Sequence, residues 1–322
     1  MRCVVLGGGS WGTALASQLA RTGHDTVLWE RHPDRAAHIN EHHTNSRYLK
    51  GVQLPDSLQA MTDIEESVRG RDLVVPSIPS HALREVMMAC RGHIGDEAVI
   101  CCATKGIEEE SLMTMHQVMG DVLAPRLHSQ LTVLYGPSFA LEVARDLPTA
   151  VVCAGALKPA ELAAQAFHSG QFRAYHTDDI IGVCIGGSLK NVMAIACGVS
   201  DGVGLGSNAR AALITRGLAE ITRLSVALGA NPLTMMGLAG MGDLVLTCTG
   251  NLSRNRRVGL ALGEGRKLDD ILEELGEVAE GVRTAKSAWK LSRRVGIEMP
   301  ITQQIFEMLY ESKPVRLALG DL

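Results

Sequence analysis

A single lysine within a long apolar stretch is the first residue that could perform acid–base chemistry. The stretch runs from Ile180 to Ser200, and Lys190 is its only charged residue. A lysine removed from water has a lowered pKa, so it can exchange a proton close to neutral pH. The alternative is that Lys190 extends to the surface or closes a structural ion pair. Lys190 is therefore a candidate catalytic residue that the rest of the chain must support or weaken.

A second chemical feature is a glycine-rich turn at the start of the chain. Gly7, Gly9 and Gly12 form a GxGxxG pattern directly after the apolar residues 2–6, and residues at helical spacing follow. The glycines of this pattern allow a tight bend, close approach of a pyrophosphate, and packing of helix on strand. Free N–H groups at the helix start then face the phosphates. The sequence therefore predicts a dinucleotide-binding site.

The residues after the next predicted strand, 25–29, give opposing indications about the dinucleotide. Glu30 suits the ribose 2′-hydroxyl of NAD, whereas Arg31 suits the 2′-phosphate of NADP or stacking on adenine. The pattern leaves NAD and NADP open as cofactors.

The elements that must position these residues follow a βα alternation in the first half of the chain. Further strands are predicted at 73–75, 98–103, 131–134, 150–154 and 173–176, with helices between them. This alternation is typical of a mostly parallel, doubly wound, Rossmann-type α/β sheet. Ligands bind outside the carboxyl ends of such strands, which is where Lys105, Gly136 and Ser138 fall. A proline at position 76 stands where the third strand would otherwise be expected to continue.

The strand patterns stop near Asp178, and the second half is predicted to be all-helical. We expect a dinucleotide-binding domain at 1–178 and a helical substrate-binding and catalytic domain at 179–322, with helices at 209–228, 268–275 and 284–295. Two loops of this half carry chemistry. One is glycine-rich and delivers Asp243, and the other, 251–257, contains three arginines that suit a phosphate or form a solvated basic loop.

The apolar stretch around Lys190 is also long enough to be considered as a membrane span. However, a lysine at the centre of a span costs about 3 kcal/mol, and four glycines interrupt this one. We therefore expect a helix buried in a soluble protein, without membrane insertion.

Composition excludes several other classes of function. A net charge of −4 and only 3% aromatic residues argue against a nucleic-acid partner. The eight cysteines form no CxxC pair, so neither disulfides nor a zinc site is expected, and a cytoplasmic location is the simpler interpretation. His38, His42 and His43 are interpreted as a surface cluster, so no metal is predicted.

Six motifs together resemble the NAD(P)-dependent glycerol-3-phosphate dehydrogenase family, of the bacterial type. They are GGGSWGTALA at 7–16, CATKGIE at 102–108, GPSFA at 136–140, the block 187–217 around Lys190, GLAGMGDLVLTCTG at 237–250, and NLSRNRRVG at 251–259. The resemblance implies reversible reduction of dihydroxyacetone phosphate to sn-glycerol 3-phosphate, which supplies phospholipid synthesis. It also implies a cytoplasmic homodimer.

The resemblance further implies roles for individual residues. Lys190 is the proton acceptor in the oxidative direction. The implied substrate-binding residues are Lys105, Gly136, Ser138, Lys190, Asp243, Ser253, Arg254 and Asn255. The implied cofactor-binding residues, beside the three glycines, are Ser10, Trp11, Arg31, Lys105, Ala140, Arg254, Val278 and Glu280. In this arrangement Lys105 would lower the pKa of Lys190 by repulsion, and Asp243 would raise it.

Two other functions remain open at this point. One is a related dehydrogenase that acts on a carboxylate substrate such as a 3-hydroxy acid or ketopantoate. The other is a dinucleotide sensor without catalytic activity, whose helical domain binds a partner.

Overall fold

The computed structural model describes all 322 residues, and the chain forms two compact units. The first unit consists of Met1–Thr104 and Met115–Ile180, and the second of Lys105–Thr114 and Ile181–Leu322. The short segment Lys105–Thr114 thus belongs to the second unit, although it precedes residue 178 in the chain.

The first unit is built on an eight-stranded sheet with the order β10-β9-β8-β7-β6-β1-β2-β5. All neighbouring strands are parallel except β8 and β9, which are antiparallel. This confirms the predicted α/β fold with a mostly parallel, Rossmann-type sheet. The strands are β1 (Arg2–Leu6), β2 (Asp25–Trp29), β5 (Gln59–Met61), β6 (Leu73–Pro76), β7 (Val99–Cys102), β8 (Leu131–Tyr135), β9 (Thr149–Gly155) and β10 (Phe172–Thr177), and a separate hairpin pairs β3 (Thr44–Asn45) with β4 (Leu49–Gln53).

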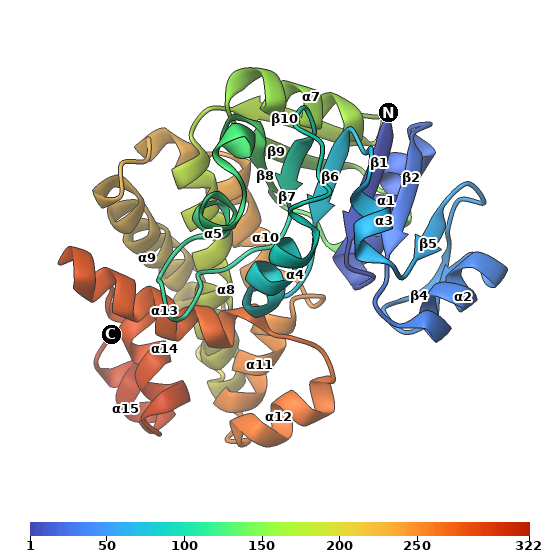
Figure 1. Ribbon diagram of the computed structural model, residues 1–322. Helices are drawn as coiled ribbons and strands as arrows, with labels where there is room; N and C mark the ends of the chain where they lie inside the picture. Colours follow the sequence, from blue (N-terminus) through green and yellow to red (C-terminus); the bar gives the residue numbers. More distant parts are fainter. The chain divides into compact units, whose positions relative to one another are not determined.

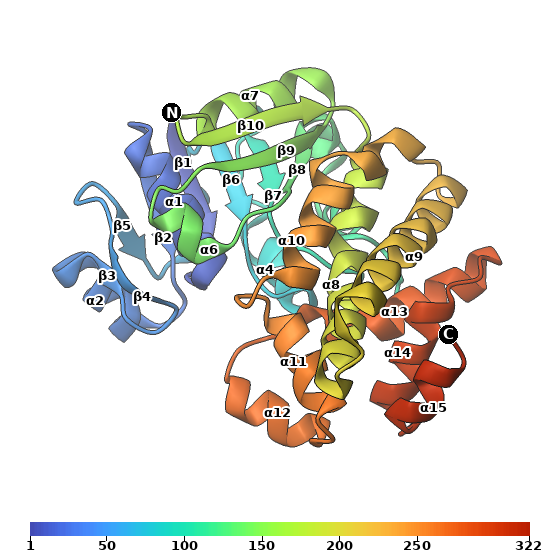
Figure 2. The ribbon, with the colours of Figure 1, turned by 180° about the vertical axis from the view of Figure 1, so that it is seen from behind.

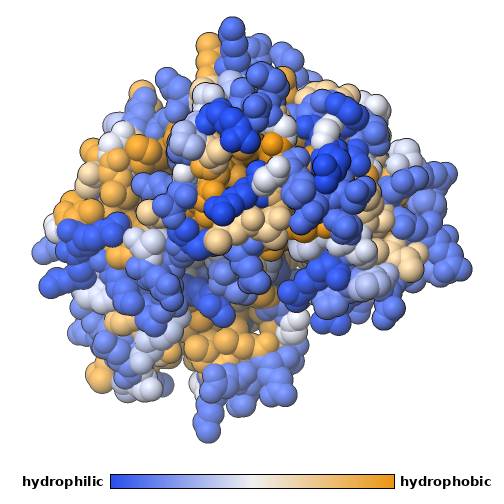
Figure 3. All heavy atoms as spheres, in the orientation of Figure 1, coloured by the Kyte–Doolittle hydropathy of each residue, from blue (hydrophilic) through white to orange (hydrophobic).

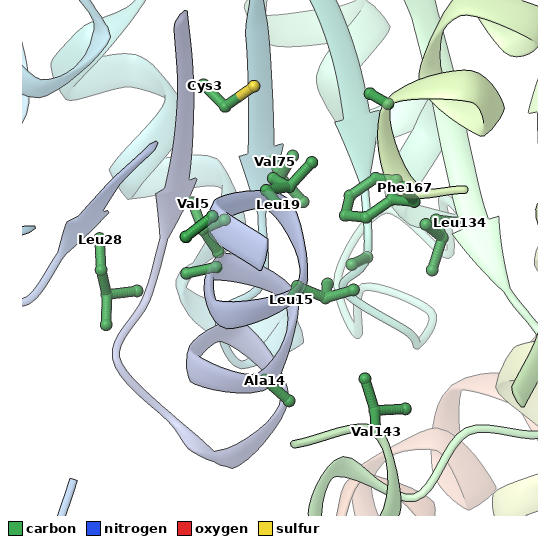
Figure 4. Packing of buried hydrophobic residues seen from close by; sticks show 14 of the residues in the cluster. Cys3, Val5, Ala14, Leu15, Leu19, Leu28, Val75, Leu134, Val143 and Phe167 are labelled. Atoms are coloured by element: carbon green, nitrogen blue, oxygen red, sulfur yellow. The ribbon is translucent and has the colours of Figure 1, made fainter. Parts of the chain in front are cut away.

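Helices cover both faces of this sheet, because the central strands are apolar on both sides. Figure 1 shows α4 on one face, and Figure 2 shows α1 and α6 on the other. In Figure 4, Leu15 and Leu19 of α1 project toward Val75 and Phe167, all within one buried cluster. The helices are α1 (Ser10–Arg21), α2 (Pro33–His42), α3 (Ile64–Val68), α4 (Leu83–Cys90), α5 (Met115–Val122), α6 (Ala140–Ala144) and α7 (Leu157–Phe167), with 3-10 turns at Ser80–Ala82 and Pro125–Gln130.

Two local features differ from the prediction. The third predicted strand continues through the proline, so that Pro76 is the last residue of β6. Its carbonyl oxygen accepts a hydrogen bond from the N–H of Ala103. The missing N–H of proline therefore leaves this pairing intact. The short strands between residues 44 and 61 were not predicted, because two- and three-residue strands carry almost no periodic signal.

The second unit contains no strand and consists of helices around one long apolar helix, α8, as predicted. α8 is flanked by α9, α10 and α11 (Figure 2). The elements are α8 (Ile180–Val203), α9 (Gly206–Ala227), a 3-10 turn (Pro232–Met236), a π-helical turn, η4 (Leu238–Gly242), α10 (Asp243–Thr249), α11 (Arg254–Gly263), α12 (Leu268–Leu275), α13 (Glu280–Val295), α14 (Pro300–Tyr310) and α15 (Val315–Gly320).

By length and composition alone, α8 is the one helix that could cross a membrane. However, 89% of its apolar window is buried inside the protein, which is typical of the core helix of a soluble domain. The face seen in Figure 3 is mainly hydrophilic, with smaller hydrophobic areas between the charged side chains.

Candidate active site

The glycine turn of the first unit has the geometry that a dinucleotide requires. Gly7 has φ of +120°, and a Cβ atom there would lie 2.5 Å from the carbonyl oxygen of Ser77. A Cβ on Gly12 would lie 1.9 Å from the carbonyl oxygen of Gly7, so only glycine lets α1 start this close to β1. Beside Gly9, by contrast, the space is open within 4 Å, and no side chain caps the N-terminus of α1. The turn therefore leaves room and N–H donors for a pyrophosphate.

The hairpin of β3 and β4, which was not predicted from the sequence, supports this turn. The side-chain amide of Asn45 donates to the carbonyl oxygen of Gly8 and to Oγ1 of Thr13, both at 2.9 Å. The hydroxyl of Ser10 donates to the carbonyl oxygen of Tyr48 at 2.8 Å. Ser10, a predicted cofactor residue, thus also holds the loop between β3 and β4. Trp11 packs against the core of the unit, and its buried Nε1 has no hydrogen-bond partner.

The end of β2 places Glu30 and Arg31 differently. The carboxylate of Glu30 is buried and forms an ion pair with Arg35, with a distance of 2.8 Å between Oε1 and Nη2. The side chain of Arg31 is exposed, and its Nε donates to Nε2 of His32 at 3.0 Å. Glu30 and Arg31, which gave opposing indications about the cofactor, therefore differ in their surroundings: Glu30 is buried and ion-paired, and Arg31 is exposed to solvent.

The second unit brings three of the predicted substrate residues together in one buried cluster. Asp243 accepts from Nζ of Lys190 at Oδ1 (2.6 Å) and from Nζ of Lys105 at Oδ2 (2.7 Å). The exposed fraction of the side chain is 1% for Asp243, 10% for Lys190 and 15% for Lys105. Two ammonium groups share one carboxylate, so the cluster carries a net positive charge that favours an anionic or electron-rich ligand.

The surroundings lower the pKa of Lys190 to about 8. Burial is the largest cause, since the charged form loses hydration, and Lys105 lowers the pKa further by repulsion. Asp243 opposes both effects. The predicted directions of the Lys105 and Asp243 effects are therefore confirmed. A lysine with this pKa can both hold and release a proton close to neutral pH.

Local packing explains how distant segments meet at this cluster. The N–H of Gly106 donates to Oγ of Ser188 on α8 at 3.1 Å, which anchors the segment that carries Lys105. Gly186, one turn before Lys190, would place a Cβ only 2.6 Å from the carbonyl oxygen of Ala239. The glycine therefore lets η4 approach α8, and Asp243, the first residue of α10, follows directly.

Thr247 completes the cluster and is not among the residues predicted from the sequence. Its hydroxyl oxygen lies 2.9 Å from Nζ of Lys190 and 2.6 Å from the carbonyl oxygen of Asp243. The available signal was its spacing: Thr247 lies one helical turn after Asp243, so both face the same side of α10.

The residues of the arginine-containing loop 251–257 have different partners and differ in exposure. Ser253 caps α11 by accepting from the N–H of Arg256 at 3.2 Å, and Arg256 pairs with Asp201 at 2.6 Å. Arg254 forms an ion pair with Glu277 at 2.9 Å, and its side chain is 41% exposed. Arg256 is therefore engaged in the core of the unit, whereas Arg254 retains contact with solvent.

Asn255 links this loop to α8. Its Nδ2 donates to Oδ1 of Asn191 at 2.9 Å, and its Oδ1 accepts from the N–H of Gly281 at 2.9 Å. Since Asn191 is the neighbour of Lys190, the loop is fixed to the same stretch of α8 as the lysine cluster.

The remaining predicted residues lie at turns and helix starts. Gly136 and Ser138 follow β8, where the hydroxyl of Ser138 donates to the carbonyl oxygen of Gly136 at 3.0 Å, and Ala140 begins α6. Val278 is exposed, and Glu280 begins α13 in the second unit. No group of three or more His, Cys, Asp or Glu side chains is placed to hold a metal ion.

Comparisons with known proteins agree over almost the whole chain. Residues 2–160 match the family model of the NAD-dependent glycerol-3-phosphate dehydrogenase N-terminus, and residues 179–320 match that of its C-terminus. A glycerol-3-phosphate dehydrogenase [NAD(P)+] of Anaeromyxobacter dehalogenans is 52% identical, over 100% of this chain and 97% of that protein. One of Myxococcus xanthus is 50% identical, over 100% and 96%.

Solved structures give the same result. The crystal structure of glycerol-3-phosphate dehydrogenase from Coxiella burnetii is similar with a TM-score of 0.93 and 41% identity, covering 99% of this chain and 97% of that one. The glycine turn, the helical second unit and these similarities agree: the chain belongs to the NAD-dependent glycerol-3-phosphate dehydrogenase family.

Proposed function

We propose that this protein is an NAD(P)-dependent glycerol-3-phosphate dehydrogenase that reversibly reduces dihydroxyacetone phosphate to sn-glycerol 3-phosphate. The observation that carries the proposal is the buried arrangement of Lys190, Asp243, Lys105 and Thr247. It combines a proton donor with a net positive charge in surroundings of low polarity, which is what reduction of a ketone needs.

Lys190 is the proposed general acid. When bound, the nicotinamide supplies hydride to the C2 carbonyl carbon of the substrate, so negative charge develops on the carbonyl oxygen. The ammonium group of Lys190 stabilises that charge and donates the proton, and in the oxidative direction the neutral amine accepts it. A pKa of about 8 leaves both forms accessible near neutral pH.

Asp243 and Thr247 position the acid. Oδ1 of Asp243 and Oγ1 of Thr247 both contact Nζ of Lys190, so the amino group has a fixed direction and one donor remains for the substrate. Lys105, held on Oδ2 of the same carboxylate, adds positive charge for the substrate and disfavours protonation of Lys190.

The phosphate of the substrate is assigned to Arg254 of the second unit, beside Ser253 and Asn255. Gly136 and Ser138 of the first unit are substrate-binding residues that the family resemblance implies. Unlike Arg256, whose side chain is 13% exposed, Arg254 has a side chain that is 41% exposed, and a guanidinium group binds phosphate with two parallel hydrogen bonds. Asn255 keeps the loop fixed to α8.

The dinucleotide is assigned to the glycine turn. Gly7, Gly9 and Gly12, with the N–H groups of Ser10 and Trp11, would hold its pyrophosphate. Arg31 would lie at the adenosine end. Lys105, Ala140, Arg254, Val278 and Glu280 complete the cofactor-binding residues that the family resemblance implies.

In the cell, the reaction would supply glycerol 3-phosphate for phospholipid synthesis. The eight free, buried cysteines are compatible with a reducing cytoplasm. We further propose a homodimer, on the basis of the family resemblance, with no nucleic-acid partner and no membrane insertion.

The test is a spectrophotometric assay with NADH and with NADPH, each combined with dihydroxyacetone phosphate. We expect nucleotide oxidation with this triose and none with ketopantoate or a 3-oxo acid at equal concentration. Oxidation with a carboxylate substrate alone would identify the related type of dehydrogenase instead. Binding of nucleotide without turnover of any of these ketones would favour the sensor.

A further inference from the structure

A buried carboxylate near the end of α8 binds two arginines that belong to different segments. The side chain of Asp201 is only 9% exposed. Its Oδ2 accepts from Nη2 of Arg256 at 2.6 Å and from Nε of the same side chain at 3.1 Å. Nη1 of Arg210, on α9, donates to both oxygens of Asp201, at 2.9 and 3.0 Å. Asp201 therefore joins α9 and the loop 251–257 to α8.

Arg256 connects the other parts of the loop 251–257 to this ion pair. Its Nη1 donates to Oδ1 of Asn251 at 3.0 Å, and its backbone N–H donates to Oγ of Ser253 at 3.2 Å. A Cβ atom on Gly198 of α8 would lie 2.2 Å from the carbonyl oxygen of Arg256, so the backbone of this arginine is in contact with α8. Arg256 is thus held through its side chain, its N–H group and its backbone.

Consecutive residues of the loop are bound to two distant positions of α8. Asn255 donates to Asn191, whereas Arg256 donates to Asp201. Asn191 and Asp201 are ten residues apart in α8, or about 15 Å at the usual rise per residue. Two attachment points with this separation fix the direction in which α11 begins, and its first residue is Arg254.

The side chain of Arg254 has little else to fix its direction. Its ion pair with Glu277 is 2.9 Å long, and the two side chains are 41% and 34% exposed. Ion pairs with this exposure contribute little to rigidity, because solvent screens them. Two parallel hydrogen bonds to a phosphate need a precise orientation of the guanidinium group. The orientation of Arg254 must therefore come from the backbone that carries it.

We propose that Asp201 is a positioning residue for the phosphate of the substrate. By holding Arg256, it fixes the start of α11 and with it the guanidinium group of Arg254. The inference rests on the proposed function in that Arg254 binds that phosphate. Lys190 lies eleven residues before Asp201, about 16 Å along α8, so the proton donor is not part of this device.

The sign of the effect distinguishes positioning from a simple effect of charge. Asp201→Asn removes a negative charge close to the phosphate-binding loop, so Coulomb attraction alone would tighten binding of the anionic substrate. Positioning predicts the opposite, because the loop loses its ion pair with α8 and Arg254 is displaced. Arg256→Gln changes the charge in the other direction and should nevertheless weaken binding in the same way.

The test is steady-state kinetics of the full chain with dihydroxyacetone phosphate and with dihydroxyacetone, which lacks the phosphate. Asp201→Asn should raise KM for the phosphorylated ketone about tenfold and change kcat less than about threefold. Its kcat/KM for dihydroxyacetone should change less than about threefold, since no phosphate is bound. The double variant Asp201→Asn with Arg256→Gln has the net charge of the parent and should raise KM by the same factor as the single variant.

Glu220→Gln is the matched control, because it removes another buried carboxylate from the same unit. Glu220 is 2% exposed and accepts from the N–H groups of Ile301 and Thr302 at the start of α14. This control should lower the melting temperature and leave both kcat/KM values within about threefold of the parent.

Three outcomes would overturn the inference. They are an unchanged or lower KM in Asp201→Asn, an equal loss of kcat/KM with both ketones, and a double variant with the KM of the parent. If Asp201→Asn does not fold because two arginines lose their counter-charge, the double variant decides. Absence of turnover of dihydroxyacetone phosphate by the parent would instead contradict the proposed function.

Discussion

At the level of single residues, one buried carboxylate organises the proposed acid–base chemistry. Asp243 uses each of its oxygens for a different lysine, and it separates the roles of the two. Lys190 is more deeply buried and also contacts Thr247, so it has the direction and the lowered pKa of a proton donor. Lys105 keeps more contact with solvent and contributes charge.

Replacing Lys190 by Met should separate catalysis from stability. The variant keeps volume and helix propensity but lacks the acid, so turnover should fall by about two to four orders of magnitude. Thermal stability near pH 7 should be retained, since Asp243 keeps Lys105 and the cost of burying the ammonium group is removed. Melting temperature and turnover should be measured on the same preparation, with the exposed Lys158→Met as control. A stable variant with near-normal turnover would move the acid to Lys105.

The lowered pKa of Lys190 also sets the pH dependence. Reduction needs the ammonium form, so kcat/KM should decline above about pH 8, whereas oxidation should rise through the same range. Because the folded pKa lies below the unfolded value of 10.5, the contribution of Lys190 to the free energy of unfolding, measured as the difference between the parent and Lys190→Met, should rise as pH increases from about 8 to 10.5. Pre-steady-state rates of both proteins, and denaturant titrations of both across pH 6.5–10.5, would check these two expectations, because the buried thiols are common to the parent and to Lys190→Met. Identical pH profiles in both directions would contradict the assignment.

Arg254 offers a test of phosphate recognition. Arg254→Lys keeps the charge but loses the planar pair of donors, so KM for the phosphorylated triose should rise about ten- to a hundredfold. The ion pair with Glu277 is partly exposed, so stability should change little. Glu277→Gln is the control, because it removes that ion pair and leaves Arg254 in place. Unchanged kinetics in Arg254→Lys would place the phosphate elsewhere.

At the level of elements, α8 is the scaffold of the helical unit. Ser188 anchors the segment of Lys105, Lys190 meets α10, and Asn191 meets α11, so successive residues of one helix contact three separate segments. Glycines make this possible where the backbones are in contact. A Cβ on Gly198 would lie 2.2 Å from the carbonyl oxygen of Arg256, and one on Gly259 would lie 2.1 Å from that of Ile195.

The seam between α8 and α11 should therefore not tolerate an added methyl group. Gly259→Ala forces two backbones apart, and overpacking of this kind costs about 1–3 kcal/mol or more. The midpoint of urea unfolding should fall accordingly. Gly320→Ala, where the space beside the glycine is open, should be neutral or slightly stabilising. Equal stability of both variants would show that the helices can separate without cost.

At the level of the whole molecule, each of the two units has its own apolar core, and the cysteines are distributed between these interiors. All eight are free and buried, and burial raises the pKa of several of their thiols, including Cys3 and Cys90 to about 12. Such thiols are shielded from reagents and carry almost no thiolate.

Ellman's reagent should consequently react very slowly with the native protein and release eight equivalents in denaturant. The measurement is the time course of labelling at pH 8 without and with urea. Rapid labelling of one or more thiols in the native state would mean that a core opens readily. Fewer than eight equivalents after unfolding would mean that a disulfide had formed.

The sequence by itself determined the features that depend on neighbouring residues. The glycine turn, the alternation of strands and helices, the change to helices after residue 179, and the isolation of Lys190 among apolar residues are all local patterns. β1 and β2 have the predicted bounds for this reason, whereas the very short strands between residues 44 and 61 carry too little pattern to detect.

Only the tertiary structure decided which charges meet. Lys105 and Asp243 are separated by 138 positions, and Lys190 and Asp243 by 53, so no spacing rule connects them. The same holds for the place of Lys105–Thr114 in the helical unit and for the anchoring of Glu30 by Arg35. The pKa of a buried group and the choice of a ligand depend on through-space contacts and on loss of water, and both exist only once the chain has folded.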